Sequence, residues 1–191
     1  MILLAYHEPG YSTGHSLVSS LSRNVESITG IRPLAVTLSG LNPRRGDIVF
    51  ALLPARGGHY HTIEEKCHRR GARLVGPIPP KISAKSIARL TRGCQKLIII
   101  YRKAKRFRDE QVEDLLEIKR ILEEAYGFTV NLEPYGSFRA LREECGVILT
   151  LTPSRIAEKL NNVIINGLLP GAHRDLALWI ASSLRGLGAI G

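Results

Sequence analysis

Short apolar runs alternate with longer amphipathic stretches along the whole chain. The runs are rich in β-branched residues and are bounded by turn residues, which predicts strands at 1–6, 34–38, 47–53, 72–76, 97–101, 128–132, 147–151 and 163–165. The stretches between them carry apolar residues at helical spacing, which predicts helices at 15–28, 61–70, 83–92, 107–126, 138–144, 154–160 and 173–184. Strands and helices in this rhythm favour an α/β fold with mostly parallel strands and helices on both faces.

The longest predicted helix, 107–126, ends at Gly127, a residue type common just after a helix. Its inner face is expected to consist of six apolar residues: Val112, Leu115, Leu116, Ile118, Leu122 and Ala125. We interpret the single tryptophan, Trp179 in the last predicted helix, as a core residue.

The pattern of the first half recurs in the second half. ILLAYH (2–7) falls on LIIIYR (97–102), DIVFALLP (47–54) on GVILTLTP (146–153), and LVGPIPP (74–80) on IINGLLPG (164–171). Such a repeat is typical of a duplicated unit. We therefore predict two similar half-domains, residues 1–95 and 96–191, each a mostly parallel sheet flanked by helices, with a cleft between them.

Histidines distinguish the two halves. His7 falls on Arg102, and GGHYH (57–61) falls on SRIAE, which contains no histidine. In open α/β sheets, ligands bind at the carboxyl ends of strands. His7 and His59 both follow strands there, so we expect them to lie close together. The alternative for 57–61 is a tight turn followed by surface histidines.

Two imidazoles can hold a divalent metal such as Co²⁺, Ni²⁺, Fe²⁺ or Zn²⁺ and leave its other positions open. A neutral imidazole can also accept a proton near pH 7. His61 is either a third ligand or a residue at the start of a helix. Gly57 and Gly58 would let a substrate approach the backbone.

Charge indicates an anionic partner. The net charge is +10, and the first 95 residues carry 13 basic residues against 5 acidic ones. Abundant arginine and lysine with a single methionine lean towards a thermophilic source.

Other features of the composition favour the cytoplasm. The chain contains no apolar run long enough to span a membrane and no sign of an export signal at its start. Three cysteines, far apart and without a CxxC pair, argue for a reducing compartment and against disulfides or a zinc ribbon.

The strand that ends in His7, followed some fifty residues later by a strand that runs through LLP into GGH (57–59), resembles the CbiX-type sirohydrochlorin cobaltochelatases. These belong to the class II chelatases, which work without ATP. The resemblance implies two α/β half-domains with the tetrapyrrole between them, and metal insertion by two histidines, here His7 and His59. Sirohydrochlorin bears eight carboxylates, which would suit the basic first half. The resemblance thus implies that Arg56 and other basic residues near the cleft hold these carboxylates. At the first histidine the family usually has a Gly-His-Gly-Ser-like turn, whereas this chain reads YHEPG (6–10).

The leading hypothesis is therefore insertion of a divalent metal, cobalt before iron or nickel, into a sirohydrochlorin-type tetrapyrrole by a cytoplasmic monomer or homodimer. A non-catalytic paralogue that only binds metal or tetrapyrrole shares every feature above. A nucleic-acid-binding protein is the other alternative, because of the basic run 102–106, although acidic residues follow it at once. No nucleotide is expected, since neither a GxGxxG nor a GxxxxGK[ST] motif occurs.

Overall fold

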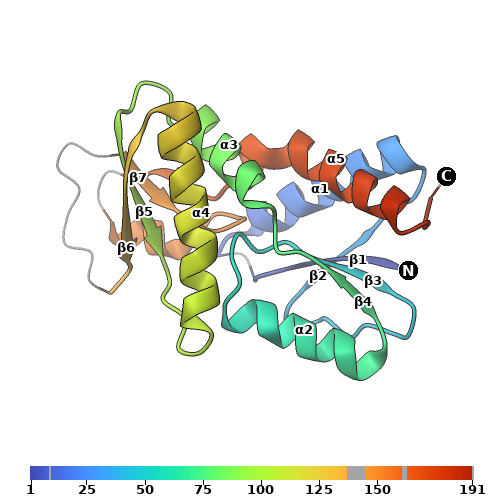
Figure 1. Ribbon diagram of the computed structural model, residues 1–191. Helices are drawn as coiled ribbons and strands as arrows, with labels where there is room; N and C mark the ends of the chain where they lie inside the picture. The colour runs from blue at the N-terminus through green and yellow to red at the C-terminus, as the bar shows by residue number, and fades with distance from the viewer. Residues whose placement is uncertain (9, 137–144, 161–162, 191) are drawn as a thin grey trace.

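This computed structural model describes residues 1–8, 10–136, 145–160 and 163–190. Within these ranges the chain forms two four-stranded parallel sheets (Figure 1). The first half contains β1 (Ile2–Tyr6), α1 (Ser12–Thr29), β2 (Leu34–Thr37), β3 (Ile48–Ala51), α2 (Gly58–Arg70), β4 (Arg73–Val75) and α3 (Pro80–Leu90). The second half contains β5 (Lys96–Tyr101), α4 (Arg108–Tyr126), β6 (Thr129–Pro134), β7 (Cys145–Ile148), the 3₁₀-helix η1 (Arg155–Lys159), β8 (Val163–Asn166) and α5 (Leu169–Gly186). The predicted fold class, α/β with two similar halves, is confirmed.

The two sheets have the same strand order. In the first it is β2-β1-β3-β4 and in the second β6-β5-β7-β8, with every described pairing parallel. The sequence repeat therefore falls on equivalent elements, β1 on β5, β3 on β7 and β4 on β8.

A glycine follows the last strand of each sheet, and for the same reason. Gly76 and Gly167 have φ angles of 135° and 106°, a region that residues with a side chain rarely adopt. A Cβ added to Gly76 would lie 2.9 Å from the Ala51 carbonyl oxygen, and one added to Gly167 would lie 2.8 Å from the Thr152 carbonyl carbon. In each half, the glycine after the fourth strand thus lies against the end of the third strand or the residues that follow it.

Side chains of β1, a central strand of the first sheet, alternate between two hydrophobic cores, one on each face of the sheet. Leu4 and Tyr6 pack with α1 and α5, whereas Leu3 and Ala5 belong to the cluster that includes residues of α2. Successive side chains of a strand point to opposite faces, so a strand covered on both sides reads as one apolar run. This explains the uniform apolar character of the strands.

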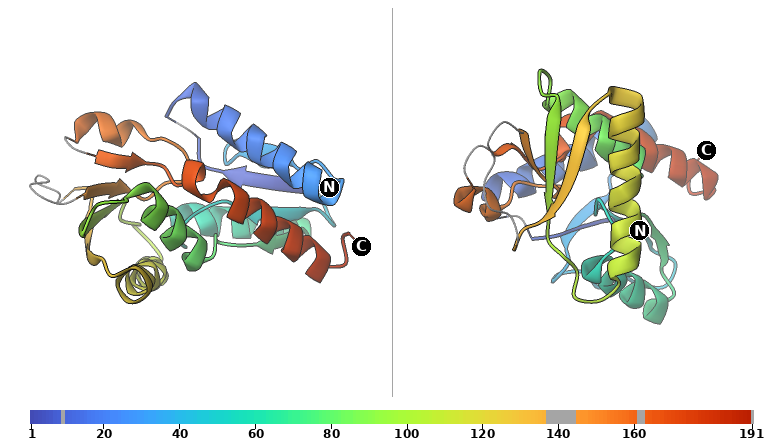
Figure 2. Two further views of the ribbon diagram at one scale, coloured as in Figure 1. Left: turned by 90° about the horizontal axis from the view of Figure 1, so that it is seen from above. Right: turned by 60° about the vertical axis from the view of Figure 1, so that its left-hand side comes forward.

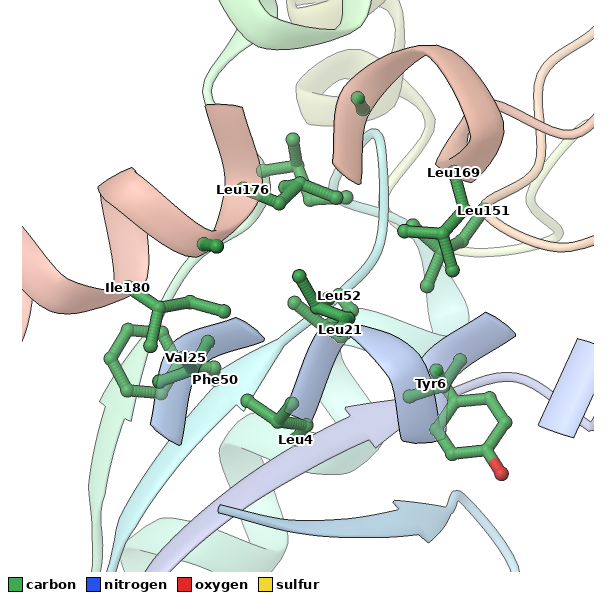
Figure 3. Close-up of a cluster of buried hydrophobic side chains, with 14 of the residues drawn as sticks. Leu4, Tyr6, Leu21, Val25, Phe50, Leu52, Leu151, Leu169, Leu176 and Ile180 are labelled. Carbon is green, nitrogen blue, oxygen red and sulfur yellow. The ribbon is translucent and has the colours of Figure 1, made fainter. Parts of the chain in front are cut away.

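The last helix of each half packs on the sheet of the other half. Helix α5 lies beside α1 in both views of Figure 2 and places Leu176 and Ile180 near Leu4 and Phe50 of the first sheet (Figure 3). In return, Ile87 of α3 packs with β5 and α4. Each half thus completes the hydrophobic core of the other. Trp179 of α5 packs edge-on against Phe50 at 5.5 Å between ring centroids, which confirms its place at the core.

Helices α3 and α5 also contact each other directly. Asp175 binds Lys85 at 2.8 Å and Arg89 on the same helix, and the Ser86 hydroxyl donates to the Leu168 carbonyl oxygen at 2.7 Å. Gly171 allows the close approach, since an added Cβ would lie 2.5 Å from the Ser86 Oγ.

The inner face of α4 is narrower than predicted. Leu115, Ile118 and Leu122 are buried as expected, but Val112, Leu116 and Ala125 are exposed. The buried residues lie three and four positions apart on one line, and Leu116 is turned by about 100° from Leu115. Asp114, next to Leu115, is buried as well, because it is paired with Arg56 of the first half.

Several helix boundaries also differ from the prediction. Helices α1, α2, α3 and α5 begin three to four residues before the predicted starts. Proline in the first turn of α3 and α5 suits that position, where no backbone hydrogen bond is lost. Residues 155–159 form a 3₁₀-helix within the predicted helix 154–160. The predicted helix 138–144 lies outside the described residues.

The expectation that the cysteines are unpaired is wrong for two of them. Cys94 and Cys145 form a disulfide with 6.3 Å between their Cα atoms, and Cys67 is buried and free. Cys94 lies just before β5 and Cys145 begins β7, and these strands are paired with Leu97 opposite Cys145. Separation in sequence concealed a pair of positions that the sheet brings together. No helix in the described ranges is long and apolar enough to cross a membrane.

Gly171→Ala should destabilise the protein by about 1–3 kcal/mol, because the added methyl group overpacks the contact of α5 with Ser86 and Leu90. Gly186→Ala in the same helix is the control: no heavy atom lies within 4 Å of its added Cβ, so alanine's helix propensity should leave stability unchanged or raise it. Chemical denaturation measures both free energies of unfolding. Equal effects of the two substitutions would contradict close packing at Gly171.

The ion pairs of Asp175 should make stability depend on acid pH. Burial alone would raise the pKa of Asp175, but hydrogen bonds from Lys85 and Arg89 outweigh it and lower this pKa. The stabilisation by these ion pairs is then complete above the ordinary aspartate pKa of about 3.9. It is lost as pH falls through the lower pKa that Asp175 has in the folded protein. Asp175→Asn should therefore cost about 1 kcal/mol at pH 7 and progressively less below pH 4.

Glu65→Gln, which removes an exposed ion pair with Arg69 on α2, is the control and should have little effect at either pH. Denaturant titrations at pH 7 and pH 3 measure the differences. A cost of Asp175→Asn that stays constant over this range would contradict the assignment.

Candidate functional site

The two histidines predicted to form a site lie next to each other. His7 directly follows β1, and His59 is in the first turn of α2, which follows β3. Because β1 and β3 are parallel neighbours, with Ala5 opposite Ala51, both chains leave the sheet at the same edge. The ring centroids of His7 and His59 are 4.6 Å apart, with an angle of 63° between the planes, and both residues are exposed.

A hydrogen bond orients the His7 ring. Nδ1 of His7 lies 2.8 Å from the backbone carbonyl oxygen of Glu8. A carbonyl oxygen can only accept, so Nδ1 carries the hydrogen and Nε2 of the neutral ring keeps its lone pair. Metal-binding histidines are commonly fixed in this way. His7 therefore offers Nε2 for a metal or a proton.

The electrostatics favour a neutral His59 beside an anionic Glu8. Partial removal from water lowers the pKa of His59, and the nearby positive charges of His7 and Arg102 lower it further. For Glu8, desolvation would raise the pKa, but hydrogen bonds from Ser39 and the adjacent His7 outweigh it and bring it to about 2. The Ser39 backbone N–H donates to Glu8 Oε1 at 2.7 Å. Thus Glu8 is turned towards the segment after β2.

The structure places His61 against the second half of the protein. Nδ1 of His61 lies 2.9 Å from Glu64, Nε2 contacts Glu110 of α4, and the ring stacks on Phe107. Residues two apart on a helix point about 200° apart, which explains why His59 and His61 diverge. Among the described residues, no three His, Cys, Asp or Glu side chains converge on one metal position. The metal-binding candidates that the structure brings together are thus His7 and His59.

Arg56, predicted to bind substrate carboxylates, is engaged by carboxylates of the protein. Its guanidinium binds Asp114 and Glu113 of α4, and its backbone N–H donates to Asp114 at 2.6 Å. The hydrogen bond with Asp114 is the largest cause of a raised Arg56 pKa. This pairing accounts for the burial of Asp114 in α4.

The two glycines before His59 have different surroundings. Gly57 is buried, and an added Cβ would lie 3.3 Å from Gln111 Nε2 and 3.7 Å from the Ala104 Cβ, both in the second half. Around Gly58 no heavy atom lies within 4 Å of an added Cβ. Gly57 therefore permits contact between the halves, and Gly58 is the one with open space around it.

Loops at the carboxyl edges of the two sheets meet around this site. Arg155 Nε donates to the Gly10 carbonyl oxygen at 2.9 Å, and the Tyr11 hydroxyl donates to Glu158 at 2.6 Å. The start of α2 lies against the start of α4, as Figure 1 shows. The histidines of the first half thus face residues of the second half.

Sequence reasoning gave Asp114 no role, and it gave Arg102 a role only in the basic run 102–106 of the nucleic-acid alternative. Arg102 follows β5 as His7 follows β1, and it is close enough to affect the charge of His59. The sequence repeat aligns Arg102 with His7, and this alignment already indicates that Arg102 lies at the corresponding strand end. For Asp114 the signal was a charged residue directly beside the apolar face of the longest helix.

Comparison with known proteins shows a likeness in fold. No protein family and no curated protein matches the sequence. Among solved structures, the chain is similar to the sirohydrochlorin chelatase SirB from Bacillus subtilis subspecies spizizenii in complex with cobalt. The match has a TM-score of 0.64 and covers 96% of this chain and 93% of that chain, at 13% sequence identity. At this identity the match establishes a shared fold.

If His7 and His59 hold a metal together, His7→Ala and His59→Ala should each weaken binding of Co²⁺ at least tenfold, because each removes one of two neighbouring ring nitrogens. Titration calorimetry under anaerobic conditions measures the dissociation constants. The matched control is His68→Ala, an exposed histidine on the same helix as His59, which should bind Co²⁺ like the unmodified protein. Unchanged affinity in both site variants would refute the assignment of the pair.

Proposed function

We propose that this protein inserts a divalent metal, preferentially cobalt, into a sirohydrochlorin-type tetrapyrrole without ATP. The observation that carries the proposal is the exposed His7–His59 pair, which offers two nitrogen ligands and leaves other coordination positions to solvent or substrate. A site built to retain its metal would be closed by further protein ligands, whereas transfer needs open positions. The fold shared with a chelatase crystallised with cobalt adds support.

The proposed roles of the residues follow from their surroundings. Nε2 of His7, which the bond to Glu8 leaves unprotonated in the neutral ring, binds the incoming metal together with His59. Insertion of a divalent metal replaces two pyrrole N–H protons, and neutral imidazoles can accept them. The lowered pKa of His59 favours the neutral form that both tasks require.

Basic residues around the pair would bind the carboxylates of the substrate. Arg102 of the second half is the nearest candidate, since its charge reaches His59. We assign Arg56 to the contact between the halves, because its guanidinium is bound by Asp114 and Glu113. Gly58, with open space around it, is the glycine at which a flat macrocycle could approach the backbone.

The proposal includes a cytoplasmic protein that acts as a monomer or homodimer. The Cys94–Cys145 disulfide is compatible with that location in a thermophile, since intracellular proteins of hyperthermophiles are often rich in disulfides.

Anaerobic incubation with sirohydrochlorin and Co²⁺ tests the function through the visible spectrum of the macrocycle. The protein should metallate sirohydrochlorin faster than a protein-free control, and His59→Ala should reduce this rate about 100-fold or more, the usual effect of losing a group that transfers protons. His68→Ala should retain the full rate.

Other spectra would favour the alternatives. A shift on binding without faster insertion would identify a carrier of metal or tetrapyrrole. No spectral shift at all would contradict binding of a tetrapyrrole. The basic segment 102–106 would then favour a nucleic-acid partner, and binding of that partner would weaken as the salt concentration rises.

A further inference from the structure

A buried carboxylate of the second half holds the loop that leads to His59. Asp114 is 8% exposed and accepts hydrogen bonds from three donors of Arg56, namely the backbone N–H at 2.6 Å, Nε at 3.1 Å and Nη2 at 2.9 Å. Bonds from a backbone amide and from the planar guanidinium of one residue fix both the position and the direction of the chain there. Arg56 precedes His59 by three residues.

The same turns of α4 also hold the loop that carries Arg102. Gln111 accepts a hydrogen bond from the Ala104 N–H at 2.9 Å and donates to the Arg102 carbonyl oxygen at 3.0 Å. The side chain of Gln111 also lies beside Gly57. Neighbouring positions on α4 therefore contact the loop before His59 and the loop of Arg102.

We propose that Asp114 is a positioning residue for the metal site and sets where His59 stands relative to His7 and Arg102. The site of the first half is then completed by a helix of the second half, although neither Asp114 nor Gln111 needs to touch the metal. This inference rests on the proposed function, because positioning matters for the reaction only if the histidines perform it.

The neighbouring Glu113 provides a matched control. It also binds the Arg56 guanidinium, at 3.2 Å, but its side chain is 68% exposed and no hydrogen bond links it to the backbone of the loop. Asp114→Asn and Glu113→Gln change the net charge equally, so a difference between them reports the position of the carboxylate rather than its charge.

Hydrogen exchange tests the positioning without reference to any activity. In Asp114→Asn the amides of Arg56 and His61, which donate to Asp114 and to the Gly57 carbonyl oxygen, should exchange at least tenfold faster, whereas in Glu113→Gln they should change less than twofold. Arg56→Lys keeps the charge and loses the planar guanidinium, so its exchange rates should resemble those of Asp114→Asn. It replaces Asp114→Asn in the test if that variant does not fold. Measurements well below each unfolding midpoint separate local loosening from global unfolding.

Kinetics of cobalt insertion into sirohydrochlorin connect the positioning to the reaction. Asp114→Asn should lower kcat at least tenfold with KM for sirohydrochlorin within threefold of the unmodified value, a split that simple loss of carboxylate binding would not produce. The double variant Arg56→Ala with Asp114→Asn should be no slower than the slower single variant, since both remove the same contact.

The outcomes are distinguishable. Unchanged exchange at Arg56 and His61 in Asp114→Asn overturns the positioning role. Faster exchange with a normal rate of insertion overturns its link to the reaction. If the unmodified protein inserts no metal, the proposed function fails, and hydrogen exchange alone then decides whether Asp114 positions the loop.

Discussion

The exchange of terminal helices between the halves is the constraint on which the rest of this structure depends. Helix α5 fills the core of the first sheet and α3 fills the core of the second, so separating the halves would expose apolar side chains of both. The contact of α3 with α5 at Gly171 and Asp175 adds a direct link between the exchanged helices. Such mutual burial fixes how the two sheets are oriented, and with them the loops at their carboxyl edges.

The functional site uses this fixed orientation. The first sheet brings His7 and His59 together because β1 and β3 are neighbours, which requires nothing from the second half. What the second half adds is the environment: the charge of Arg102, the contact of Glu110 with His61, and the buried Asp114. The repeat thus supports two different tasks, with the histidines proposed to bind metal on one copy and charged and polar contacts on the other.

Much of the fold could be predicted from the sequence because buried parallel strands are apolar along their whole length. The repeat of ILLAYH and LIIIYR indicated equivalent central strands, and the observed strand orders agree. The approach of His7 to His59 also followed from strand ends alone, and their rings do lie together.

What the sequence could not provide were contacts between distant segments. The sequence predicts that Arg56 binds substrate carboxylates and does not show its pairing with Asp114, which lies 58 residues away. It likewise does not show that the pairing of β5 with β7 brings Cys145 near Cys94. Leu116 was assigned to the core because helical spacing does not show how wide a face its neighbours cover.

The disulfide has a consequence for how the protein depends on its surroundings. Cys94 and Cys145 are 51 residues apart, and the segment between them contains α4, which contacts the functional loops. A cross-link of this length restricts the unfolded chain, which in the chain-entropy description favours the folded state by about 4 kcal/mol. That is a large part of the stability of an ordinary domain. The resistance of this protein to unfolding is therefore tied to the thiol–disulfide balance of the compartment that contains it.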